Sequence, residues 1–146
     1  MPHRPLFRHL HRVTYAECTL GNHIYHSRYL DLLEAARGEF MRSIGHPMIQ
    51  LQADGYIFPV IEATLRYVRP ARYDDLLFVE VRVIELDALR VSVQHRVLRG
   101  ADELLVDGIT RHVCTSVEEK PRRMPKAVLE ALTLWVREPA VTPTRD

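Results

Sequence analysis

Residues 27–45 read SRYLDLLEAARGEFMRSIG, and their apolar side chains recur at steps of three and four residues. This period is typical of an amphipathic α-helix with one face turned to a core, here of about four to five turns. Ser27 suits the N-cap, and Gly45 followed by Pro47 ends the helix. The apolar positions are Leu30, Leu33, Ala36, Phe40, Met41 and Ile44. One long helix is therefore the most strongly predicted element.

The segments on both sides of this helix are rich in strand-forming residues, and several alternate between apolar and polar side chains. Before the helix, residues 7–15 form one candidate strand, and residues 17–23 form a loop that contains Gly21-Asn22. After a second loop at residues 51–55, four more strands are predicted at residues 56–68, 76–86, 89–98 and 104–117. A short helix is predicted at residues 125–136, where Pro125 suits the first turn.

This order of elements predicts an α+β protein rather than alternating βαβ units. A five-stranded antiparallel sheet wrapped around the long helix satisfies both periods, and the short C-terminal helix completes the fold. The long helix can cover only one face of the sheet, so the other face and the sheet edges need cover. We therefore expect a homo-oligomer, either a dimer or a tetramer. We also expect one domain over residues 1–146, with its core at about residues 8–136.

The composition excludes several classes of protein. Lys and Arg total 20 against 19 Asp and Glu, so the net charge of +1 gives no reason to expect a nucleic-acid partner. No apolar segment has the length of a signal peptide or a membrane helix, so we expect no membrane insertion. The two cysteines, Cys18 and Cys114, are far apart and fit no metal site, which favours reduced thiols in the cytoplasm. No metal or cofactor is expected.

Two blocks of sequence carry a resemblance to a known family. Residues 13–30, VTYAECTLGNHIYHSRYL, resemble the signature of the 4-hydroxybenzoyl-CoA thioesterase-like hotdog family, which includes the acyl-CoA thioesterases associated with the Tol–Pal system. The family pattern is approximately Y-x-D-T-D-x-x-G-V-V-Y-H-x-x-Y-L, followed by a helix with E-x-A-R, which Glu34–Arg37 match. Residues 67–75, YVRPARYDD, resemble the family's segment between its second and third strands.

The resemblance implies a hotdog fold and the hydrolysis of an acyl-CoA or acyl carrier protein thioester to a free acid and a thiol. It also implies dimers that pair their sheets edge to edge, often associated into tetramers, with active sites at the dimer interface. In the family, the second Asp of D-T-D is the catalytic carboxylate. A backbone N–H at the start of the long helix polarises the thioester carbonyl, aided by the helix dipole.

The chain departs from the family pattern at the catalytic position. An alignment without gaps places Glu17 at the first Asp and Thr19 at the second, and a threonine hydroxyl is no base at neutral pH. Three interpretations follow, besides a carboxylate elsewhere in the chain. Glu17 reaches the thioester with its longer side chain, or His23 acts as the base while Thr19 positions water. Alternatively, the chain is a non-catalytic module that binds acyl-CoA or a protein partner in the same cleft.

Further residues are candidates by their place in the two blocks. His26 matches the family's Tyr-His, and we expect its backbone N–H to matter more than its imidazole. Glu34 is expected to hydrogen-bond the active-site loop from the inner side of the helix, and Cys18 to pack rather than to act as a nucleophile. His95 and His112 are expected to be hydrogen-bonded on strands. The predicted substrate-binding residues are Asn22, Tyr25, Glu34, Arg69, Arg72 and Tyr73.

Overall fold

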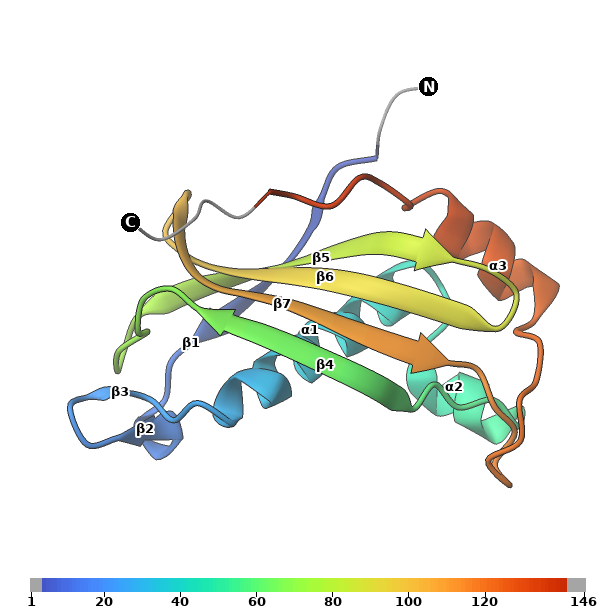
Figure 1. Ribbon diagram of the computed structural model, residues 1–146, viewed down its shortest axis with the longest axis horizontal. Helices are drawn as coiled ribbons and strands as arrows, with labels where there is room; N and C mark the ends of the chain where they lie inside the picture. Colours follow the sequence, from blue (N-terminus) through green and yellow to red (C-terminus); the bar gives the residue numbers. More distant parts are fainter. Residues whose placement is uncertain (1–3, 142–146) are drawn as a thin grey trace.

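A five-stranded antiparallel sheet forms one layer of the protein in the computed structural model, which describes residues 4–141. Its strand order is β1-β5-β6-β7-β4, so β1 and β4 are the edges. The bounds are β1 Phe7–Arg12, β5 Leu76–Leu86, β6 Arg90–Arg99, β7 Glu103–Val113 and β4 Val60–Tyr67. The long helix α1, Arg28–Ser43, lies along one face of this sheet (Figure 1). This arrangement confirms the predicted hotdog fold.

The core lies between α1 and the sheet, where the apolar face of the helix packs on the apolar face of the strands. The inner face of α1 buries Tyr29, Leu32, Leu33, Ala36, Phe40 and Met41. Alternate residues of β5 meet this face, and Leu77, Val79, Val81 and Val83 are at most 3% exposed. Because burial of such side chains is worth about 1.5–3 kcal/mol each, this interface dominates the stability of the fold.

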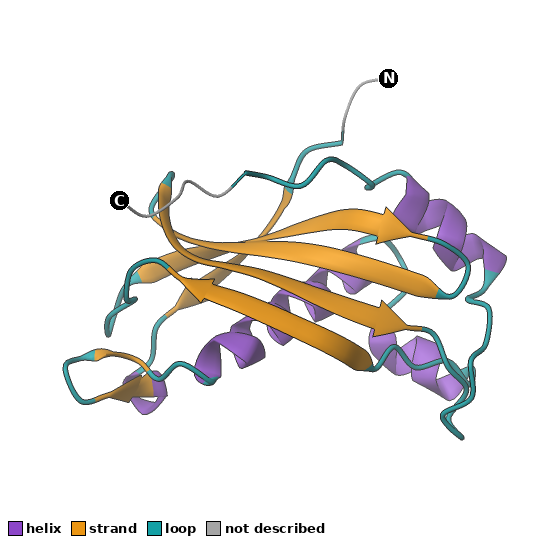
Figure 2. Ribbon diagram, viewed as in Figure 1, coloured by secondary structure: helices purple, strands orange, loops and turns teal. Residues whose placement is uncertain are grey.

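Several element bounds differ from the prediction. The first strand ends at Arg12, because Tyr15–Glu17 form a 3₁₀ turn. The predicted loop at residues 51–55 is wrong, because α2 spans Met48–Ala53 with Leu51 buried against the core. Helix α3 spans Lys126–Thr133 at one end of the sheet, as Figure 2 shows. The predicted loop at residues 17–23 contains the two short strands β2, Cys18–Thr19, and β3, His23–Ile24.

The face of the sheet opposite α1 carries charged residues of alternating sign. One row of aligned residues crosses all five strands with alternating sign, in the order Arg8, Glu80, Arg96, Asp107 and Arg66. Opposite charges on neighbouring strands stabilise a sheet, and Arg8 contacts Glu80 at 3.0 Å. The segment after α3 also crosses this face, where the backbone of Ala140 exchanges two hydrogen bonds with Gln94. This face therefore has cover within the chain itself.

Within residues 4–141, no helix is both long enough and apolar enough to cross a membrane.

Candidate functional site

A cavity of about 510 Å³ opens at the N-terminal end of α1, and we call it the motif cavity. The β2–β3 hairpin projects from the body of the protein at this end (Figure 1). One wall comes from the hairpin and the start of α1, and the other from the end of β4 and the segment after it. The lining residues are Thr19, Leu20, His23, Ile24, Tyr25, His26, Tyr29, Tyr67, Val68, Arg69 and Pro70.

The hairpin brings Thr19 and His23 together. They are directly opposite each other in the β2–β3 ladder, so their side chains lie on the same face a few ångströms apart. The turn between them needs two positive backbone angles, and φ is +84° at Gly21 and +57° at Asn22. Packing adds to this constraint, because a Cβ at Gly21 would lie 3.2 Å from the His23 ring, which is a tight contact. The hairpin therefore places the imidazole of His23 on the same face as the hydroxyl of Thr19.

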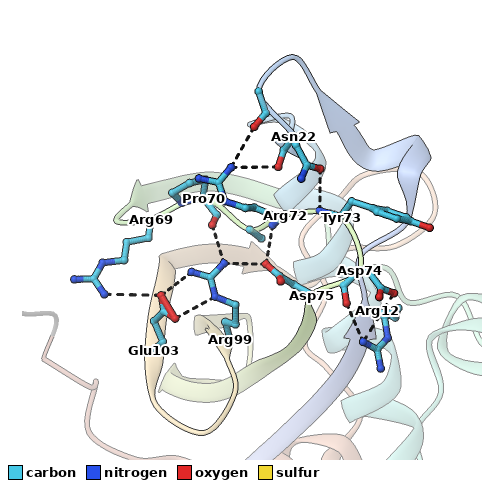
Figure 3. Close-up of polar contacts among 12 residues, drawn as sticks. Arg12, Asn22, Arg69, Pro70, Arg72, Tyr73, Asp74, Asp75, Arg99 and Glu103 are labelled. Carbon is cyan, nitrogen blue, oxygen red and sulfur yellow. Dashed lines mark hydrogen bonds and ion pairs between the residues drawn. The ribbon is translucent and has the colours of Figure 1, made fainter.

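The segment after β4 holds this hairpin in place (Figure 3). The Arg72 guanidinium donates to the carbonyl of Gly21 at 3.1 Å, and the backbone N–H of Tyr73 donates to Asn22 Oδ1 at 3.3 Å. Asn22, Arg72 and Tyr73 are therefore joined to one another, and none of them lines the motif cavity. Their contacts support a role in positioning the hairpin rather than the expected role in binding substrate.

Arg99 anchors the same segment from β6. It donates to Asp75 at 2.8 Å and to Glu103 at 2.6 Å, and also to the carbonyl of Pro70 at 3.2 Å (Figure 3). Hydrogen bonds from Glu103 and then Asp75 raise the pKa of Arg99. Arg69 lies at the edge of this network, 3.8 Å from Glu103, and lines the motif cavity. It is the one basic side chain of the predicted substrate-binding set that the described structure places there.

His26 lines the motif cavity two residues before α1 and has a backbone donor that is unpaired in the described structure. Ser27 occupies the predicted N-cap position, but its side chain makes no capping hydrogen bond. The backbone N–H of His26 has no protein acceptor among residues 4–141, whereas its carbonyl accepts from the Tyr67 hydroxyl at 3.0 Å. Because the N-terminus of a helix carries partial positive charge, this N–H can stabilise a developing oxyanion.

Glu17 does not line the motif cavity and has a structural role in the first turn. Its carboxylate accepts from the Thr14 N–H at 2.7 Å and from the Thr14 hydroxyl at 2.9 Å, and contacts His11 Nε2 at 2.8 Å. Partial burial opposes the charged form, but the bonds from Thr14 and His11 outweigh it and lower the pKa of Glu17. The carboxylate therefore has its partners already. No aspartate or glutamate in the described part of the chain lines the motif cavity.

Cys18 adjoins this turn without entering the motif cavity. Its thiol donates to the Thr14 carbonyl at 3.6 Å. Burial raises the pKa of this thiol, and so does the negative charge of Glu17. Both effects disfavour the thiolate that a nucleophile needs, so the geometry supports the packing role that the sequence predicts.

Glu34 does not contact the active-site loop, so the expected hydrogen bond is wrong. It lies on the exposed side of α1 and lines a second cavity of about 810 Å³, between α1 and the start of β4. Its side chain makes no hydrogen bond to the described residues. A helix turns 100° per residue, so Glu34 faces away from the core that its neighbour Leu33 enters.

Tyr29 and Tyr67 are cavity residues that the motif comparison did not identify. Their rings lie 5.6 Å apart, and the Tyr29 hydroxyl accepts from the N–H of Ala71 at 3.1 Å. Tyr67 stands in the second block quoted above, two residues before Arg69, and its side chain is 42% exposed. The two tyrosines connect α1 with the end of β4 across the motif cavity.

A family model described as the thioesterase-like superfamily matches residues 13–132. The chain belongs to this superfamily. The matched range begins just before residues 15–24, which we call the motif loop, and ends in α3. The match therefore covers this thioesterase-like chain from the first turn to the last helix. It includes the hairpin, the start of α1 and the end of β4, which together form the motif cavity.

Relatives and solved structures are similar to this chain over most of its length. The acyl-CoA thioester hydrolase YbgC of Escherichia coli is 30% identical over 125 residues, which cover 85% of this chain and 93% of the relative. A probable thioesterase from Bartonella henselae has 30% identity and a TM-score of 0.78, covering 83% of this chain and all of that one. A hypothetical protein of Thermus thermophilus has 35% identity and a TM-score of 0.83, covering 88% of this chain and 98% of that one.

Proposed function

We propose that this thioesterase-like chain hydrolyses acyl-CoA thioesters in the motif cavity. The observation that carries the proposal is the arrangement of His23, Thr19 and the free N–H of His26 around one cavity at the start of α1. A thioester hydrolase needs a base for water and a donor for the oxyanion, and these residues supply both. The relatives named as acyl-CoA thioester hydrolases support the same reaction.

In this mechanism the imidazole of His23 removes a proton from water, which the Thr19 hydroxyl orients. The resulting hydroxide attacks the thioester carbonyl, and the oxyanion accepts a hydrogen bond from the N–H of His26. The C–S bond then breaks, and the leaving thiolate takes the proton from His23. The products are a free acid and a thiol. Glu17 has no part in these steps, because His11 and Thr14 occupy its carboxylate.

The thiol side of the substrate leaves the motif cavity past Arg69, whose guanidinium is exposed and suits a phosphate of coenzyme A. An acyl carrier protein presents the same pantetheine arm and remains the second substrate class for this site. A solved relative from Staphylococcus aureus, 15% identical, was determined in complex with CoA and shares the fold with a TM-score of 0.87.

We also propose that two copies pair through the edge strand β4. Seven of its eight residues are exposed, including Val60 and Ile61 at 47% and 59%. An uncovered edge strand is a template for pairing, and closed symmetry satisfies it in a dimer. Light scattering over a range of concentrations tests this pairing. The two unpaired cysteines, Cys18 and Cys114, support a reducing cytoplasmic location.

The test of the proposed function is thiol release from a panel of short, long and aromatic acyl-CoAs. The expected result is turnover of at least one acyl class, with each thiol matched by one acid. Reaction mixtures without substrate correct for the thiol of Cys18. Bound acyl-CoA without turnover across the whole panel would contradict the proposal and favour a binding module.

A further inference from the structure

The carbonyl of His26 accepts its hydrogen bond from a side chain of the sheet. The carbonyls on both sides of it, those of Tyr25 and Ser27, accept backbone N–H groups at 2.8 and 3.2 Å. Within residues 4–141 no backbone N–H donates to the His26 carbonyl, and its partner is the Tyr67 hydroxyl at 3.0 Å. A side chain at the end of β4 therefore holds a carbonyl that the backbone leaves free.

Both peptide groups that flank the Cα of His26 are held by hydrogen bonds. The peptide between Tyr25 and His26 carries the free N–H, and its carbonyl accepts from the N–H of Arg28 at 2.8 Å. The peptide between His26 and Ser27 is held at its carbonyl by Tyr67. A trans peptide is planar, and its C=O and N–H point in opposite directions, so a held carbonyl fixes the whole group. Loss of the Tyr67 bond releases one of the two anchors of His26.

Tyr67 stands on a rigid part of the fold. It is the last residue of β4 and pairs with Val106 of β7. The next two N–H groups, those of Val68 and Arg69, both donate to the carbonyl of Leu105, at 2.8 and 3.0 Å. The backbone on both sides of Tyr67 is therefore tied to β7. A group that a sheet holds in this way is placed more precisely than a group on a loop.

The ring of Tyr29 packs against the ring of Tyr67 and restricts its side-chain torsions. Tyr29 is 2% exposed, and the two rings lie 5.6 Å apart with an interplanar angle of 59°. Aromatic rings at this separation attract each other. The Tyr29 hydroxyl accepts from the N–H of Ala71 at 3.1 Å, and the Ala71 carbonyl accepts from the N–H of Ile24 at 2.9 Å. These contacts join β3, α1 and the segment after β4 around the phenol of Tyr67.

The hydroxyl of Tyr67 has one proton, and the His26 carbonyl accepts it. A carbonyl can only accept, so Tyr67 is the donor of this bond. Burial raises the pKa of Tyr67, so the hydroxyl keeps its proton at neutral pH. Tyr67 also lines the motif cavity, but it cannot donate the same proton to a substrate. Its contribution to the reaction is therefore indirect and passes through His26.

We propose that Tyr67 is a positioning residue for thioester hydrolysis, because its hydroxyl holds the His26 segment so that the free N–H stays directed at the oxyanion. This inference rests on the proposed function, in which that N–H binds the oxyanion. A donor held in place beforehand needs no rearrangement in the transition state. An interaction that is made only with the developing oxyanion contributes to kcat rather than to substrate binding.

The first experiment compares the steady-state kinetics of wild type, Tyr67→Phe and Tyr56→Phe on the acyl-CoA that the wild type hydrolyses fastest. Removal of a whole oxyanion donor costs about 10²–10³-fold in kcat, and Tyr67→Phe displaces the donor without removing it. We therefore expect kcat to fall about tenfold while KM stays within about twofold. Tyr56→Phe is the matched control, because Tyr56 lies outside the motif cavity and keeps the ring that contacts Arg122. This variant should keep the kcat of the wild type.

The second experiment measures the backbone order parameter of His26 by ¹⁵N relaxation in histidine-labelled protein without substrate. A rigid backbone amide has an order parameter of about 0.85, and a mobile one lies below about 0.6. We expect a rigid His26 amide in wild type and Tyr56→Phe, and a lower value in Tyr67→Phe. The amide of His95, which is buried on β6, is the internal reference and should stay rigid in every variant.

An order parameter at His26 that Tyr67→Phe leaves unchanged would overturn the inference, and so would equal kcat for Tyr67→Phe and Tyr56→Phe. A rise in KM with unchanged kcat would also overturn it, because that result assigns the phenol to direct contact with substrate. Absence of turnover by the wild type contradicts the proposed function, whereas the order parameter still decides whether Tyr67 holds His26. The two proposals therefore fail in distinguishable ways.

Discussion

The two halves of the motif loop have opposite roles, although the family pattern places acidic residues in both. In the first half, Tyr15–Glu17, the carboxylate of Glu17 closes a turn with Thr14 and His11. In the second half, the β2–β3 hairpin directs Thr19 and His23 into the motif cavity. The first half stabilises the loop, and the second half carries the polar groups suited to chemistry. A residue's place in a motif therefore does not by itself decide its role.

The two halves differ because the carboxylate of Glu17 already has hydrogen-bond partners, whereas the ring of His23 has none in the described structure. A carboxylate that already accepts from a backbone N–H, a hydroxyl and a histidine is a weak base, and its pKa falls. His23 lies against Gly21 and makes no side-chain hydrogen bond to the described residues, so its ring is available to water. The comparison predicts that changes in the hairpin alter turnover, whereas changes in the turn alter stability.

The largest effect is expected from restoring a carboxylate to the hairpin. In a His23→Gln background, Thr19→Asp should raise kcat for acyl-CoA hydrolysis by about a hundredfold, because a general base contributes about 10²–10⁴-fold. Thr133→Asp adds the same charge on α3 and is the matched control. If the added Asp gives no more activity than this control, the hairpin does not hold the catalytic base.

The next effect concerns the hydroxyl of Thr19. Thr19→Val keeps the shape of the side chain but removes the group that orients water, so kcat should fall about tenfold, or about 1.4 kcal/mol in barrier height. Thr19→Ser keeps a hydroxyl and should retain most of the activity. Steady-state kinetics of both variants on one acyl-CoA provide the measurement. Equal activity of the Val and Ser variants would exclude a role for the hydroxyl.

A smaller effect is expected on stability from the turn. Glu17→Ala removes the capping interactions of Thr14 and the contact with His11, so the free energy of unfolding should fall by about 1 kcal/mol. For a chain of this size, that loss lowers Tm by about 3 °C. Glu118→Ala, at an exposed position, serves as the control. Unchanged stability in thermal unfolding would show that the turn does not depend on Glu17.

The smallest effect is expected in the pH dependence of the Tm difference between wild type and Glu17→Ala. The pKa of Glu17 is lowered in the folded state, so the folded protein holds the charged form more strongly than the unfolded chain does. Its stabilising contribution is therefore present above the unfolded pKa of 4.5 and is lost as the pH falls through the lower, folded value. The Tm gap between wild type and Glu17→Ala should be constant near pH 7 and should narrow below pH 4.5. A gap that widens in acid would contradict this assignment.

Much of the fold could be predicted because apolar residues recur at regular spacing along its main helix and strands. The helix at residues 28–43 and the strand at residues 76–86 each turn one apolar face to the same core. Helix α2 was missed because its six residues bury only Leu51, which is too short a pattern to distinguish from a loop. The strands of the motif hairpin have two residues each, and a pattern of period two cannot be recognised over that length.

The site was only partly predictable, since contacts between distant residues decide it. Thr14-Tyr15-Ala16-Glu17 has the pattern of a capping box, a local signal for the structural role of Glu17. The bond from Tyr67 to His26 joins residues 41 positions apart, and no local pattern indicates it. Catalysis by His23 with Thr19 was one of three interpretations of the sequence, and it stays a prediction until turnover is measured.

The most direct measurement is kcat for one acyl-CoA with Glu17→Gln and His23→Gln side by side, with His46→Gln as a control outside the motif cavity. Each Gln keeps the size and polarity of the side chain it replaces but cannot act as a base. The account predicts that His23→Gln lowers kcat at least a hundredfold, whereas Glu17→Gln and His46→Gln stay within threefold of the wild type. A hundredfold loss in Glu17→Gln, with His23→Gln still active, would contradict it.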